Sequence, residues 1–113
     1  MTSPIDPATL EQFTCGDKDI ARDIYAQFLT ATENDANALR AAIAAGLGAD
    51  ICKAAHRVKG ASRMIGAAAV ADLAEKIELA GRRDDLAEIT ATMPAFDAEH
   101  ERLLNFLHLQ LAG

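Results

Sequence analysis

One histidine stands among basic residues in the segment 51–66. This segment has no acidic residue and four basic ones: Lys53, Arg57, Lys59 and Arg63. The whole chain has a net charge of −6, so the remaining residues together carry −10. On a helix with about 100° per residue, His56 lies about 140° from the direction of the apolar side chains. That core face comprises Ile51, Ala55, Val58, Ser62 and Ile65. The spacing therefore predicts an imidazole that points into solvent, beside cations.

An exposed imidazole of this kind suits phosphoryl transfer. Histidine titrates near neutrality, so a neutral ring nitrogen is available as a nucleophile. Lys59 is one turn away, at the flank of the core face, where it could hydrogen-bond a phosphoryl group on His56. Gly60 points almost directly outward and costs a helix interior about 1 kcal/mol relative to alanine. Its missing side chain would let a partner approach His56 closely.

Each of these features also has a purely structural reading. A surface histidine is usually only solvated, exposed cations usually improve solubility, and a glycine inside a helix usually marks close helix packing. Ser62 is expected to bond back to the carbonyl one turn earlier, and Gly66 is expected to cap the helix. It is the combination of these residues that favours a functional site.

Other candidate sites are weaker. Cys52 and His56 are four residues apart, but a structural zinc site needs four ligands and a catalytic one usually three, and no second pair stands nearby. His100 is in phase with apolar residues, which favours a buried histidine, and His108 lies on the same predicted helix. The chain has no glycine-rich phosphate loop, so ATP binding is not expected.

The composition indicates that helices position these residues. Alanine is abundant, valine occurs twice and tryptophan is absent, which favours helices over strands. Helical periodicity and capping residues predict a short helix from Asp6-Pro7 to Gly16 and four longer ones. The longer helices are expected from Asp17 to about Ala45, from Ala49 or Asp50 to about Ile65, from about Ala67 to Ala80, and from Asp84 or Asp85 onward. Such a pattern predicts an all-α, antiparallel four-helix bundle with an additional short N-terminal helix, in one domain spanning 1–113.

Three details of these helices are specific enough to test. In the second helix the predicted core stripe consists of Ile20, Ile24, Phe28, Ala31, Ala38 and Ala42, widened by Leu39 and Ile43. Gly81 is expected to end the fourth helix. Pro94 falls inside the last helix, whose apolar phase is unbroken from Leu86 to Leu111, so a kink is expected rather than a break.

The net charge excludes general nucleic-acid binding, which needs clustered cations. Cys15 and Cys52 are expected to be reduced thiols. No run reaches the roughly 18 apolar residues of a membrane span, and the first residues lack the pattern of a signal peptide. We therefore expect a cytoplasmic, monomeric protein without a cofactor or metal of its own.

The pattern His56-x-x-Lys59-Gly60-x-Ser62-x-x-x-Gly66 resembles the signature of histidine-containing phosphotransfer (HPt) domains. The helix layout and the residues Leu73, Ile77, Ala80 and Asp84-Asp85-Leu86 are also similar to that family. The run 55–66 is most similar to HPt domains at the C-terminal end of bacterial hybrid sensor kinases. The resemblance implies a four-helix bundle whose exposed histidine is phosphorylated by a receiver-domain aspartate.

The resemblance also implies roles for individual residues. His56 would accept the phosphoryl group on the ring nitrogen remote from the backbone, Lys59 would neutralise it, and Gly60 would leave room for the receiver. Arg63 and Met64 lie at positions where such proteins vary, so the resemblance gives them no role; we ourselves assign Arg63, Arg57 and Met64 to docking. The receiver would supply a divalent metal and an acidic pocket, and the chain itself would have no autokinase activity.

Two other functions stay open at this point. A non-catalytic helical interaction module could bind a partner through the same basic face without phosphorylation. A metal-dependent enzyme on a bundle scaffold is also conceivable, although the sequence offers no ligand set for one.

Overall fold

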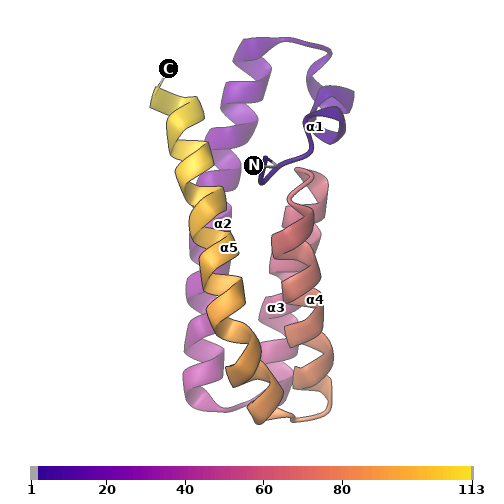
Figure 1. The fold of residues 1–113 in the computed structure, drawn as a ribbon, viewed down its shortest axis with the longest axis vertical. Coiled ribbons are helices and arrows are strands. Elements are labelled where there is room, and N and C mark those ends of the chain that lie inside the picture. The colour runs from indigo at the N-terminus through magenta and orange to yellow at the C-terminus, as the bar shows by residue number, and fades with distance from the viewer. Residues whose placement is uncertain (1–2, 113) are drawn as a thin grey trace.

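Five helices make up most of residues 3–112 (Figure 1). The computed structural model describes residues 3–112, so Met1, Thr2 and Gly113, at the ends of the expected 1–113 domain, lie outside the described residues. The helices are α1 (Pro7–Thr14), α2 (Lys18–Ala45), α3 (Gly48–Met64), α4 (Ala68–Arg82) and α5 (Leu86–Ala112). No strand occurs within residues 3–112, and the all-α prediction is confirmed.

Helices α2 to α5 alternate in direction and form the predicted antiparallel bundle (Figure 1). The molecule measures 43 × 25 × 22 Å, because α2 and α5 are much longer than α3 and α4. The two long helices lie side by side and extend beyond the α3–α4 pair. The short helix α1 covers the end that this pair leaves open. Helix α3 packs against α4 more extensively than any other two helices pack together.

The helix ends follow the capping residues of the sequence. Asp6 stands directly before Pro7, the first residue of α1, and its carboxylate accepts a hydrogen bond from the backbone N–H of Ala8. Asp17 caps α2 in the same way, and Gly46 ends it in the left-handed conformation with φ +71°. Of the two candidate caps for α5, Asp85 accepts from the backbone N–H of Glu88.

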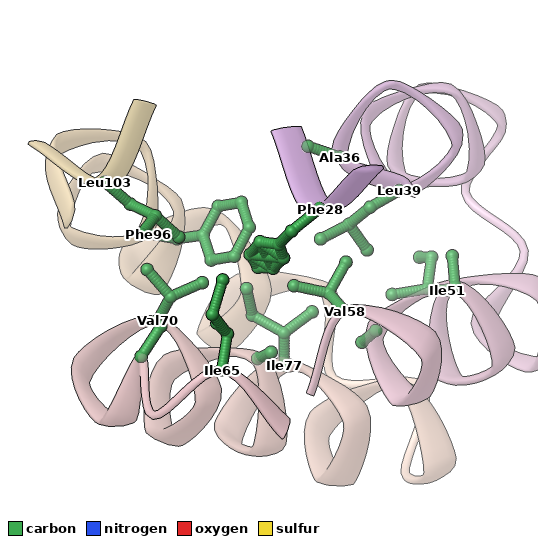
Figure 2. Packing of buried hydrophobic residues seen from close by; sticks show 14 of the residues in the cluster. Phe28, Ala36, Leu39, Ile51, Val58, Ile65, Val70, Ile77, Phe96 and Leu103 are labelled. Carbon is green, nitrogen blue, oxygen red and sulfur yellow. The ribbon is translucent and has the colours of Figure 1, made fainter. Parts of the chain in front are cut away.

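The core lies between the four long helices, where aliphatic and aromatic side chains from all of them converge (Figure 2). Phe28 and Leu39 come from α2, and Phe96 and Leu103 come from α5. They meet the residues of α3 and α4, of which Figure 2 labels Ile51, Val58, Val70 and Ile77. Burial of such side chains removes apolar surface from water and fixes the rotation of each helix about its axis.

The predicted core stripe of α2 was partly wrong. Ile20, Ala31 and Ala38 are exposed, whereas Thr32 and Ala36 are buried beside Phe28 and Leu39. A buried threonine is not visible to a hydrophobic pattern, because its burial depends on a hydrogen bond with another helix, here between its hydroxyl and the ring of His100.

The prediction that Gly81 ends the fourth helix was also wrong. Helix α4 continues to Arg82, and Gly81 packs against the backbone of α3. A Cβ at Gly81 would lie 3.0 Å from the carbonyl oxygen of Gly48 and 3.1 Å from the backbone nitrogen of Cys52. The glycine therefore allows α3 and α4 to approach closely. Pro94 lies inside the continuous helix α5, so it does not break that helix.

Candidate functional site

The imidazole of His56 projects from the middle of α3, and its side chain is 67% exposed. The opposite face of α3 is buried and includes Ile51, Ala55, Val58, Ser62 and Ile65. Because this face packs into the core, it holds His56 outward, and the predicted orientation of the imidazole is confirmed.

A buried carboxylate from α4 contacts His56. Only 3% of the Glu78 side chain is exposed, and its Oε2 lies 2.9 Å from His56 Nδ1. The other carboxylate oxygen, Oε1, lies 2.5 Å from Lys59 Nζ. A guanidinium nitrogen of Arg82 lies 3.3 Å from Oε2. Glu78 thus connects the histidine to two cations.

These contacts determine the charge of Glu78. Burial raises the pKa of its carboxyl group, but the hydrogen bonds and positive charges of Lys59 and His56 outweigh burial, so the pKa is lowered from 4.5. The carboxyl group is therefore ionised at neutral pH and can only accept hydrogen bonds.

An ionised Glu78 assigns the tautomer of His56. Because the carboxylate can only accept, Nδ1 must carry the hydrogen that it donates to Oε2. In a neutral ring, Nε2 then keeps its lone pair. Nε2 is the ring nitrogen remote from the backbone, so the arrangement produces an exposed imidazole with its nucleophilic nitrogen pointing away from the helix.

The other predicted site residues lie on either side of His56. The Lys59 side chain is only 15% exposed, because it reaches back to Glu78. Gly60 is exposed, and a Cβ there would meet nothing within 4 Å, so Gly60 is not a helix-packing glycine. Arg63 is half-exposed and pairs with Glu75 at 3.4 Å.

Arg57 and Met64, the other two predicted docking residues, are in different places. Arg57 and His56 line the same open hollow of about 560 Å³, together with Ala49, Cys52, Lys53, Glu78 and Arg82. Met64 is exposed and does not line this hollow. It lines an apolar groove of about 330 Å³ with Leu10, Phe13 and other residues of α1, α2 and α3.

Ser62 does not make the predicted bond to the carbonyl one turn earlier. It is fully buried on the core face of α3, and its Oγ has no hydrogen-bond partner among the described residues. Both cysteines, Cys15 and Cys52, are free thiols.

Residues 3–112 offer neither a cluster of metal ligands nor a helix that could span a membrane. They contain no group of three or more histidine, cysteine or acidic side chains placed to hold a metal ion. None of their helices combines the length and apolar character that a bilayer crossing requires.

Glu78 and Arg82 were not predicted from the sequence as residues of the site. An acidic residue in an amphipathic helix is ordinarily assigned to the solvated face. One signal was available: Glu78 is in helical phase with Ala71, Ala74 and Gly81, which are all buried. An acid within a stripe of small buried residues indicates a carboxylate that needs a partner on the neighbouring helix.

This chain is similar to known proteins both in sequence and in fold. A sequence model for the family described as "Hpt domain" matches residues 23–106. The chain matches none of the curated proteins with which it was compared. Its fold is similar to the crystal structure of histidine-containing phosphotransfer protein B (HptB) from Pseudomonas aeruginosa PAO1, with a TM-score of 0.89 and 21% sequence identity. That match covers 99% of this chain and 97% of HptB.

Proposed function

The chain belongs to the Hpt domain family of phosphocarriers, which serve phosphorelays in two-component signalling, and from this premise we propose that His56 carries the phosphoryl group. The observation that supports this assignment is the hydrogen bond between His56 Nδ1 and Glu78 on an imidazole that is two-thirds exposed. His100 is buried, and no carboxylate of residues 3–112 pairs with His108.

The proposed step needs no proton transfer from the attacking atom. The lone pair of His56 Nε2 forms a bond to the phosphorus of a receiver's aspartyl phosphate, and the bond between phosphorus and the aspartate oxygen breaks. The aspartate leaves as a carboxylate. The ring becomes positively charged, and Glu78 stabilises this charge through the hydrogen on Nδ1. In the reverse direction a receiver carboxylate attacks the same phosphorus.

Lys59 and Gly60 support this step in the proposal. The Lys59 ammonium has three N–H donors, so it can keep its contact with Glu78 Oε1 and offer another to a phosphoryl oxygen. Gly60 leaves the surface beside His56 open to the receiver. We assign Arg57, Arg63 and Met64 to the surrounding docking surface.

The partner is proposed to complete the chemistry. Receiver domains are the partners of this family, and the receiver would supply the divalent metal and the acidic pocket. The chain would act as a cytoplasmic monomer without autokinase activity, and its receiver could belong to a hybrid sensor kinase.

The test is phosphoryl transfer from a receiver labelled with radioactive phosphate. We expect the wild-type chain to acquire an acid-labile, base-stable label, and His56→Gln to acquire none. His108→Gln is a matched control, since His108 is also exposed but lies on α5. Label retained by His56→Gln would reject the site. No label on the wild type with several receivers would favour the interaction module without phosphorylation.

A further inference from the structure

The cations on the two sides of His56 differ in whether acids already neutralise them. Toward the C-terminal end of α3, Lys59 pairs with Glu78 at 2.5 Å and lies 4.0 Å from Glu75. Arg63 pairs with Glu75 at 3.4 Å. The charge of +4 that the sequence shows in residues 51–66 is therefore partly compensated by α4.

Toward the N-terminal end of α3 the cations are not compensated in this way. Lys53 and Arg57 are exposed and form no ion pair with any acid of residues 3–112. Both line the 560 Å³ hollow beside His56. The third cation of this hollow is Arg82, which comes from α4, and the only acid lining it is Glu78.

Arg82 lies close to the imidazole. One of its guanidinium nitrogens is 3.3 Å from Glu78 Oε2, the same oxygen that accepts the hydrogen bond from His56 Nδ1. The Arg82 side chain is 64% exposed, so its remaining N–H groups are not confined by the core. A guanidinium has five N–H donors in a planar fork, which suits a phosphoryl group while one donor stays on Glu78.

We propose that Arg82, with Arg57 and Lys53 around the same hollow, forms a second cationic subsite for the phosphoryl group on His56. This inference rests on the proposed function of His56. The phosphoryl group then lies between Lys59 on one side and Arg82 on the other, and both cations are positioned by the two oxygens of Glu78. A group with a charge near −2 is better compensated by two such cations than by one.

The subsite can be tested by the position of the phosphotransfer equilibrium. Since an equilibrium between free species does not depend on docking, it reports how stable phosphohistidine is relative to the receiver's aspartyl phosphate. We expect Arg82→Gln to shift the equilibrium about fivefold toward the receiver, the size expected of an exposed ion pair. Arg83→Gln is the matched control, because Arg83 is the next residue, carries the same charge and does not line the hollow.

A receiver-free measurement complements the equilibrium. Phosphoramidate is the probe: His56 Nε2 bonds to its phosphorus, the phosphorus–nitrogen bond breaks, and ammonia leaves. We expect Arg82→Gln and Arg57→Gln to accumulate less phosphohistidine than Arg83→Gln, and Arg82→Lys to recover part of the loss. Circular dichroism confirms that each variant is folded.

The outcomes separate the two proposals. If the wild type is never labelled, His56 is not the carrier, and the proposal of a phosphoryl subsite is refuted as well. If the wild type is labelled and Arg82→Gln behaves like Arg83→Gln in both measurements, the subsite is refuted while the carrier role of His56 stands.

Discussion

His56 and His100 are each held by one side-chain hydrogen bond, yet their surroundings are opposite. His56 is two-thirds exposed on α3, and its Nδ1 contacts the Glu78 carboxylate at 2.9 Å. His100 on α5 is 3% exposed, and its Nε2 lies 3.2 Å from the Thr32 hydroxyl. Its ring also stacks on Phe96, with a centroid distance of 5.7 Å and an interplanar angle of 10°.

The difference shows how the bonded nitrogen determines what a histidine can do. The carboxylate of Glu78 engages Nδ1 and leaves Nε2 of His56 available to a partner. In His100 the remote nitrogen is the one that is engaged, and the core covers the ring. Burial, followed by the charge of Arg40, lowers the pKa of His100 below 6.5, so this ring is neutral in the folded protein at pH 7.

The largest effect is expected when the carboxylate of Glu78, the partner of His56, is removed. Glu78→Gln keeps the size of the side chain but loses the charge that stabilises a cationic His56 ring. We expect the rate of transfer from a receiver to fall roughly 10- to 100-fold, the size of the loss when a carboxylate that orients a metal-binding histidine is removed. Rapid-quench measurement of label transfer tests this, and Asp72→Asn on the same helix is the control, because Asp72 is exposed and does not line the hollow beside His56. Equal rates for the two variants would mean that Glu78 is only structural.

A smaller effect is expected for His100, on the pH dependence of the free energy of unfolding. Because its pKa is lower in the folded state than in the unfolded one, the unfolded chain binds more protons below about pH 6.5. The stability that His100 contributes is present above pH 6.5 and is lost as the pH falls through the folded pKa. The charged groups around it are Arg40, Asp97 and Glu33.

Urea unfolding at pH 7.5, 6.5 and 5.5 measures this dependence. His100→Gln is expected to lose about 1–3 kcal/mol of unfolding free energy at pH 7.5, because a buried hydrogen bond is disturbed. Its unfolding free energy should also fall less than that of the wild type between pH 6.5 and pH 5.5. His108→Gln should keep the wild-type slope of unfolding free energy against pH. The same slope in all three proteins would show that His100 does not titrate on unfolding. Glu78 acts in a lower window, since its stabilisation is lost only as the pH falls below about 4.5.

Effects of the same size or smaller concern two buried hydroxyl groups. Thr32→Val leaves His100 Nε2 without its partner and is expected to cost about 1–3 kcal/mol of unfolding free energy. Ser62→Ala removes a hydroxyl that has no hydrogen-bond partner among the described residues, so we expect a change within about 0.5 kcal/mol or a slight stabilisation. Thermal unfolding of both variants measures the difference. A large loss for Ser62→Ala would indicate a partner for its hydroxyl.

The exposed histidine and the helix ends could be predicted from the sequence because both depend on local rules. Asp6, Asp17 and Gly46 act within their own turns. The orientation of His56 follows from the apolar residues on the other face of α3. This information is contained in a single helix and its periodicity.

The partners of these residues could not be predicted, because they depend on two helices at once. Glu78 is buried only because His56, Lys59 and Arg82 surround its carboxylate. Thr32 is buried only because His100 faces it from α5. Ser62 was expected to bond within its helix, but its hydroxyl is buried in the core without a hydrogen-bond partner among the described residues. Contacts across helices therefore account for most of what the pattern of one helix did not predict.

The contact of Gly48 with Gly81 has a consequence for the reactivity of the histidine. These glycines set the distance between the axes of α3 and α4 one turn from Glu78, where even a single Cβ at Gly81 would crowd the Gly48 carbonyl. Moving α4 outward by about 1 Å would stretch the bond of Glu78 to His56 beyond the range of a hydrogen bond. A methyl group added at Gly81, one turn from Glu78, is therefore expected to weaken the contact that keeps the hydrogen on His56 Nδ1.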